Sequence, residues 1–170
     1  MGAVRARPMT DTPPSGSGSQ SPPTSTPGTP AAHAVAQVKK ALIEAGFEIF
    51  RTRGDEIVLA ERPRENLILD SGVRVRTGAS LEIRIVARAQ KADFPNDEDE
   101  HLFARARAAA ARATAAGFIE VDASTMRVND PGDASRTLDT FYEVTFAKAA
   151  ATLPDAVTEV RFALSLEKRA

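Results

Sequence analysis

The residue types best suited to acid–base or metal chemistry gather in one stretch, Asp97-Glu98-Asp99-Glu100-His101. Asp97 and His101 are four residues apart and would share a helix face, so with Glu98 they could ligate a metal or act as an acid and a base. A helix N-terminus explains the same residues, because carboxylates there cap free N–H groups and offset the helix dipole. The other histidine, His33, lies at the edge of a polar tail. We interpret the stretch as a helix cap and expect no metal and no cofactor.

Groups that would support covalent catalysis or nucleotide binding are scarce. The chain has no cysteine, so it has neither a thiolate nucleophile nor sulfur ligands for zinc. Serine and aspartate are plentiful, but neither histidine stands in a context that suggests a base beside a nucleophile. Gly54, Gly72 and Gly78 are isolated turn glycines without the close spacing of a phosphate-binding loop. The sequence therefore favours a protein that is not an enzyme.

Four arginines could project from one side of a predicted hairpin and contact phosphates or an acidic partner: Arg74, Arg76, Arg84 and Arg88. An ion-paired, solvated face is the preferred interpretation, because Glu82 lies among them and the 22 Lys and Arg nearly balance the 23 Asp and Glu. Tryptophan is absent and there is one tyrosine, so base stacking has little support. We expect no nucleic-acid partner.

The aromatic residues allow a second kind of site, a cavity for an apolar ligand between helices and sheet. Its lining would be Phe47, Phe50, Phe118, Tyr142, Phe146 and Phe162. A packed core is the preferred interpretation, because a domain with eight phenylalanines, one tyrosine and no tryptophan needs most of them for packing.

The chain divides into a tail and one domain. Residues 1–31 are rich in Pro, Ser, Thr and Gly, a composition too poor in apolar side chains to offset the entropy of ordering, so we expect them to be disordered. Residues 32–170 form a single α+β domain in this interpretation. Neither an export signal nor a stretch able to span a bilayer is evident, so we expect a cytoplasmic protein without membrane contact.

The first half of the domain reads as a helix followed by strands. Val35, Val38 and Leu42 recur at helical spacing before Gly46, and two strands then flank the turn Arg53-Gly54-Asp55. The next predictions are a strand at 67–69, a turn at Asp70-Ser71-Gly72 and strands at 73–76 and 81–90. Alternation in the last strand demands a loop of odd length before it, and we predict three residues with Gly78 left-handed, which places Arg74 opposite Glu82.

The second half repeats the helix and then continues in strands. A helix from Asn96 or Asp97 to Gly117 would bury a stripe of Leu102, Ala106, Ala109, Ala113 and Ala116. Strands are predicted at 118–121 and 126–128, with a loop at 129–133. Two long strands would close the chain, one with Tyr142, Val144 and Phe146 inward, the other with Val160, Phe162, Leu164 and Leu166 inward. The predicted fold has two main helices on a curved, mostly antiparallel sheet of about six to eight strands.

A helix, a glycine, a phenylalanine and a strand occur twice, at residues 41–49 and 112–120, which would fit two pseudo-repeats of a helix plus about four strands. The order from Val35 to Phe146, with the acidic-capped helix and the Gly-Phe-Ile-Glu-Val-Asp strand, resembles the YbjN-type sensory transduction regulators, whose fold is similar to that of type III secretion chaperones. The alanine-rich middle of the second helix departs from that family, where a polar asparagine is expected.

The resemblance implies a noncatalytic regulatory or chaperone-like domain that binds protein. Together with the absence of catalytic motifs, it leads us to expect a protein-interaction module that uses its helix and sheet surface, with a protein partner and a possible homodimer. A small apolar-ligand-binding domain is the alternative.

Overall fold

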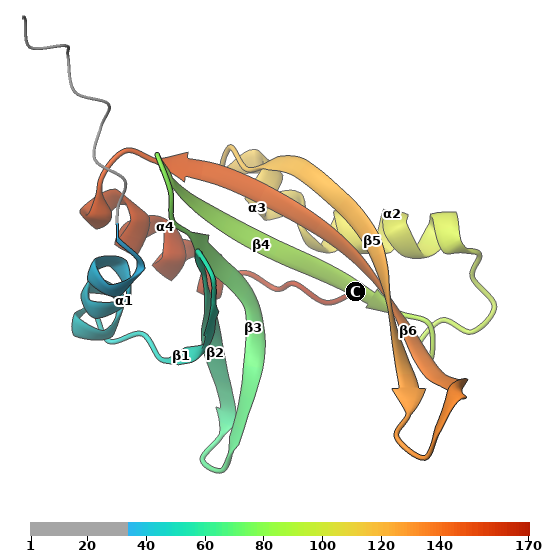
Figure 1. Ribbon diagram of the computed structural model, residues 1–170. Helices are drawn as coiled ribbons and strands as arrows, with labels where there is room; N and C mark the ends of the chain where they lie inside the picture. The colour runs from blue at the N-terminus through green and yellow to red at the C-terminus, as the bar shows by residue number, and fades with distance from the viewer. Residues whose placement is uncertain (1–33) are drawn as a thin grey trace, which may run out of the picture.

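One six-stranded antiparallel sheet organises the part of the chain that the structure describes, residues 34–170 of a computed structural model (Figure 1). The first four strands form a meander, and the last two form a long hairpin that pairs with the fourth, giving the order β1-β2-β3-β4-β6-β5. The α+β class and the antiparallel sheet are thereby confirmed. The strands are β1 (Ile49–Arg53), β2 (Glu56–Arg64), β3 (Leu67–Arg76), β4 (Leu81–Gln90), β5 (Ile119–Asp130) and β6 (Asp133–Ala150).

Four helices lie within residues 34–170, where two main helices were expected. Leu42, Leu102 and Val160, each from a different helix, join one buried cluster with Ile83 and Ile85 of β4. The helices therefore pack on one face of the sheet, and we call the opposite face, which no described helix covers, the open face. The helices are α1 (Val35–Glu44), α2 (Asp99–Ala109), α3 (Ala111–Ala115) and α4 (Leu153–Leu164).

The register of β3 against β4 confirms the expected odd loop and corrects its length. Val73 lies opposite Ile85 and Val75 opposite Ile83, as the alternation requires. The predicted three-residue loop is wrong, because Arg76 rather than Arg74 lies opposite Glu82. The cause is Thr77, whose N–H and hydroxyl both donate to the carbonyl of Asp55 and hold the chain beside the β1–β2 turn. Gly78 is not among the left-handed glycines.

The predicted turn at Asp70-Ser71-Gly72 is a bend inside β3, not a reversal. Gly72 has φ +74°, its N–H donates to the Asp70 carboxylate at 2.8 Å, and the Ser71 hydroxyl donates to the carbonyl of Leu59 on β2. The local turn chemistry is thus present, and it forms an irregularity in the strand: β3 pairs with β2 on both sides of it, with a register shift between Val58 and Ala60. β3 pairs with β4 only from Val73 to Arg76, so the part of β3 that precedes Val73 lies apart from β4.

The predicted long second helix is two helices with a break at Ala110. Helix α2 begins at Asp99, and the N-cap is Glu98 rather than Asn96 or Asp97. The Asp97 carboxylate instead accepts a hydrogen bond from Arg105 at 2.6 Å. The buried residues of α2 and α3 include Leu102, Ala106 and Ala113 of the predicted stripe, whereas Ala109 and Ala116 are half-buried.

The predicted final strand is wrong, because Val160, Phe162 and Leu164 belong to helix α4. Thr152 caps this helix by accepting from the Asp155 N–H at 3.2 Å, with a proline in the first turn. The buried side chains Ala156, Val160 and Ala163 have helical spacing, which the alternating apolar residues concealed. Consequently the second predicted repeat has two strands and a helix instead of four strands.

The corner that suggested a repeat is nevertheless formed twice. Gly46 and Gly117 both have φ +88°. Each is followed by a phenylalanine whose N–H reaches back to the preceding helix, Phe47 to the carbonyl of Leu42 and Phe118 to that of Ala113. These are the closures of a left-handed C-cap, so the echo reflects a shared way of ending a helix.

The C-terminal residues fill the gap that opens where β3 leaves β4. The Arg88 N–H donates to the carbonyl of Lys168 at 2.8 Å, and the Ala170 N–H donates to the carbonyl of Arg88 at 3.0 Å. This parallel bridge occupies the edge of β4. Leu166 is buried, and the Lys168 ammonium donates to carbonyls at the end of α4, including Ala163. Desolvation lowers the pKa of Lys168.

Candidate functional site

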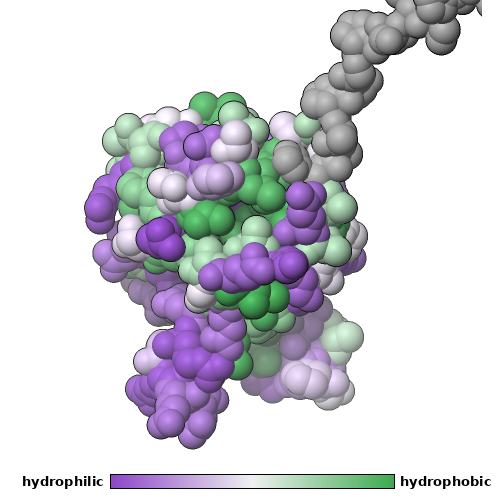
Figure 2. Space-filling model, turned by 90° about the vertical axis from the view of Figure 1, so that its left-hand side faces the viewer, coloured by the Kyte–Doolittle hydropathy of each residue, from purple (hydrophilic) through white to green (hydrophobic). Residues whose placement is uncertain are grey.

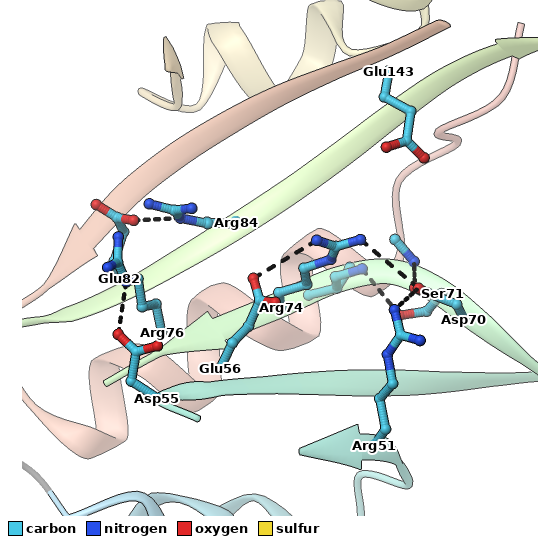
Figure 3. A network of polar contacts seen from close by, with 12 residues as sticks. Arg51, Asp55, Glu56, Asp70, Ser71, Arg74, Arg76, Glu82, Arg84 and Glu143 are labelled. Carbon is cyan, nitrogen blue, oxygen red and sulfur yellow. Dashed lines mark hydrogen bonds and ion pairs between the residues drawn. The ribbon is translucent and has the colours of Figure 1, made fainter. Parts of the chain in front are cut away.

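The structure places the four predicted arginines on the open face, as the predicted hairpin requires. Arg74 and Arg84 lie directly opposite each other on β3 and β4, with Arg76 and Arg88 two and four residues away on the same side of their strands. Figure 3 shows the side chains around this group with their dashed contacts. Arg74, Arg84 and Arg88 are largely buried, and Arg76 is about half exposed.

Every arginine in this group has a carboxylate close by. Arg84 lies 2.5 Å from Glu82, and Arg88 lies 2.6 Å from Glu143, its direct neighbour on β6. The remaining pairs are Arg76 with Asp55 at 2.8 Å, Arg74 with Glu56 at 3.7 Å, and Arg51 of β1 with Asp70 at 3.9 Å. Hydrogen bonding to Arg76 lowers the pKa of Asp55. Five carboxylates thus neutralise five arginines.

The arginine group also covers apolar side chains of the sheet. Val58, Arg74, Arg84 and Ala147 form one row across four strands, because each lies opposite the next in the register. Val58 and Ala147 are buried although no described helix packs on this face. The long arginine side chains shield them, as guanidinium-tipped side chains commonly do. A neutral, ion-paired layer of this kind offers a free phosphate or acidic peptide few unpaired charges.

The aromatic residues pack in the core rather than around one cavity. Phe118, Tyr142 and Phe146 are buried, and Phe47 and Phe162 pack against the same cluster. Phe118 stacks on Phe162 with ring centroids 6.4 Å apart. Phe50 lies apart and is exposed. An open depression beside α3 includes Phe118 and Phe146 from this set, together with Ile119 and Glu120.

The acidic stretch at the start of α2 is used within the fold. Asp99 accepts a hydrogen bond from the hydroxyl of Tyr142, and this bond raises the pKa of the tyrosine. Asp97 binds Arg105, and His101 is exposed. Within residues 34–170 no three His, Cys, Asp or Glu side chains are placed to hold a metal ion. His33 lies outside the described residues, as does the predicted disordered tail.

One surface feature was missed in the sequence, the outer edge of β5. Strands β5 and β6 extend beyond the helices as a curved arm, opposite a second arm formed by β2 and β3 (Figure 1). We call residues 119–140 the β5–β6 arm. β5 is the last strand of the sheet, so along its length one row of N–H and C=O groups has no strand of residues 34–170 beside it. All twelve residues of β5 except the last are exposed.

Exposed large apolar side chains concentrate on this arm. Five of the nine such residues in the described chain lie there: Ile119 at 67% exposure, Val121 at 46%, Met126 at 42%, Val128 at 38% and Leu138 at 51%. The alternation of Met126 and Val128 was visible in the sequence. It could not reveal that β5 is an edge strand, because strand order is a property of the whole sheet.

The face of α1 presents a more mixed surface. Figure 2 looks at the molecule from the α1 side and shows apolar residues over the helices above a hydrophilic arm. Ile43 on α1 is 53% exposed. Phe47 is half-buried and lies under the guanidinium of Arg161, 5.7 Å from the ring centroid. The backbone groups of α1 are engaged within the helix, which distinguishes this face from the β5 edge.

Comparisons of the chain with protein-family models, with curated proteins and with solved structures gave no match. None of the helices in residues 34–170 is long and apolar enough to cross a membrane.

Proposed function

We propose that the chain is a noncatalytic protein-interaction module, a regulatory adaptor or chaperone-like domain. The observation that carries the proposal is the β5 edge, which combines free backbone groups with exposed apolar side chains over twelve residues of the described chain. Proteins recognise extended partners by adding a strand to such an edge, with backbone hydrogen bonds for affinity and side chains for specificity. The resemblance to YbjN-type regulators leads to an expectation of the same class.

The opposite edge of the sheet is less suited to this role. β1 has five residues and carries Arg51 and Arg53. Short edge strands with charged side chains are a common protection against strand addition. β5 also carries charged residues, but it is more than twice as long and has four exposed large apolar side chains. The proposal therefore assigns binding to the β5–β6 arm rather than to the sheet edges in general.

Ligand binding in an apolar cavity is the alternative function, and it has less support. Five of its six aromatic residues pack into or against the core cluster. A cytoplasmic protein fits the proposed module, although the β5 edge would bind a strand in the same way in any aqueous compartment.

The proposal is tested by affinity capture from the host with the wild type and two lysine variants. Val128→Lys places a charge on the β5 edge, whereas Ile43→Lys places one on a similarly apolar, exposed position of α1. We expect the wild type and Ile43→Lys to capture the same partner protein and Val128→Lys to lose it. The partner can be another protein or a second, differently tagged copy of the chain. Retention by all three, or by none, would contradict the assignment of binding to β5.

A further inference from the structure

We infer that the strand added to β5 is the β5 strand of a second copy of this chain, in an antiparallel pair centred on Ser124. The inference rests on the proposed function and names the partner for that site. A symmetric pair of this kind uses the same surface on both copies, so each residue i that contacts residue j is matched by j contacting i. The sequence of β5 must therefore be complementary to itself.

The register against β6 shows which side chains of β5 share a face. Ile119 lies opposite Ala147 and Ser124 opposite Glu143, so both are on the open face. Met126 and Val128 follow at two-residue steps on that face. Glu120 lies opposite Phe146 on the helix face, and the bulge at Val121 lets the strand keep its alternation on either side. Arg127 lies on the same face as Glu120.

An antiparallel pair must bring residues of the same face together, because its twofold axis is perpendicular to the sheet. With Ser124 on the axis and Val121 bulged, Ile119 lies opposite Val128 of the second copy. Glu120 then lies opposite Arg127 of the second copy. Each contact occurs twice by symmetry, so the register provides two apolar pairs on the open face and two opposite-charge pairs on the helix face.

Neighbouring registers lose this complementarity. A shift of the axis to Thr125 places Ile119 opposite Asp130 and Glu120 opposite Asn129. A shift to Ala123 keeps an apolar contact between Ile119 and Met126 but places Glu120 opposite Thr125. A twofold axis that passes between two residues would pair side chains of one face with side chains of the other face in the regular part of the strand. The pleat of the strand excludes such pairing. Of these three centres, Ser124 is the one that pairs Ile119 with Val128 and Glu120 with Arg127, and it leaves one unlike contact, Asp122 opposite Met126 on the open face.

The two charged residues of the proposed pair are accessible on the surface of the described chain. Glu120 already accepts hydrogen bonds from Arg107, at 2.8 Å and 2.9 Å, and this bonding lowers its pKa. The carboxylate thus stays ionised at neutral pH and remains 37% exposed. Arg127 is exposed. Glu120 of one copy can therefore contact Arg127 of the other without breaking a buried ion pair.

Cysteine cross-linking tests the register directly, because the chain has no cysteine of its own. Directly opposed residues of an antiparallel pair have Cα atoms about 4.5–5.5 Å apart, within the range of a disulfide. We expect Ser124→Cys to form a covalent dimer under mild oxidation. Ser135→Cys, at an exposed position of β6 rather than on β5, is the control and should remain monomeric. Failure of Ser124→Cys to cross-link, or equal cross-linking of the control, would overturn the inference.

A charge reversal tests the same register by equilibrium. Arg127→Glu would place two carboxylates opposite each other twice, and we expect the dimer dissociation constant, measured by light scattering after size exclusion, to rise about tenfold or more. Arg53→Glu makes the same charge reversal on β1, at the opposite edge of the sheet, and should leave the constant unchanged. A wild type that is monomeric by native mass spectrometry would overturn the second copy as partner. Capture of a different protein that is lost in Val128→Lys would in that case still support the proposed function.

Discussion

Gly72 is the residue at which β3 separates from β4, and replacing it with alanine provides a sharp test of the fold. Its φ of +74° lies in the left-handed region, where a side chain is strained. A Cβ atom at this position would lie 2.8 Å from the carbonyl oxygen of Val86. That oxygen belongs to the backbone of a central strand, so it has little freedom to move away.

Two contributions set the expected cost of Gly72→Ala. The left-handed conformation costs about 1 kcal/mol for a residue with a Cβ. The contact with the Val86 carbonyl forces a backbone shift, which adds about 1–3 kcal/mol by analogy with overpacked cores. The free energy of unfolding should therefore fall by about 2–4 kcal/mol. Gly54 isolates the first contribution, since its φ is +58° and no atom of the described chain beyond its immediate neighbours lies within 4 Å of where a Cβ would stand.

Urea denaturation followed by circular dichroism measures both variants against the wild type, with the slope of the transition checked for two-state behaviour. We expect Gly54→Ala to lose about 1 kcal/mol and Gly72→Ala to lose at least twice as much. Equal losses would refute the reasoning, because they would show that β3 and β4 do not approach as closely as the structure has them.

Three further predictions concern the ion pairs and the core. Hydrogen bonding to Arg107 lowers the pKa of Glu120 in the folded chain. The pair therefore stabilises the fold above the pKa of glutamate in the unfolded chain, and this stabilisation is lost as the pH falls through the folded-state pKa. NMR titration should find a higher Glu120 pKa in Arg107→Gln than in the wild type. Arg88→Glu faces the largely buried Glu143 and should lower the free energy of unfolding by about 1–3 kcal/mol in urea, whereas Arg76→Glu, at a half-exposed position, should cost less than about 1 kcal/mol. Phe118→Ala removes a fully buried ring and should cost about 3–5 kcal/mol, and a melting temperature equal to that of the wild type would contradict its place in the core.

Periodicity predicted those elements that have one apolar face and local end signals. β4 was recognised because Leu81, Ile83 and Ile85 alternate with charged residues, and α1 because Val38 and Leu42 have helical spacing before Gly46. The odd parity of the β3–β4 loop followed from the same alternation. The register itself depended on Thr77 bonding to the carbonyl of Asp55, a contact between residues 22 positions apart that no local pattern records.

Helix α4 shows why the remainder was not predictable. In residues 160–166 apolar residues stand at alternate positions, which fits a strand, while Ala156, Val160 and Ala163 fit a helix only if the alanines are counted as core. Alanines can be assigned to the core only when the sheet surface against which the helix packs is known. The arginines of the open face were grouped correctly from alternation, but their neutralisation by Glu56 and Glu143 requires β2 and β6 beside them.

The bridge between Arg88 and the C-terminal residues bears on the order in which the sheet is completed. The edge of β4 near Arg88 has no partner until Lys168 and Ala170 arrive, 80 residues or more after it in the chain. During synthesis this edge of β4 has no partner until residues 168–170 have left the ribosome. An unpaired edge in a partly folded chain is a site for aggregation, so refolding yield should depend more on these last residues than their few contacts suggest.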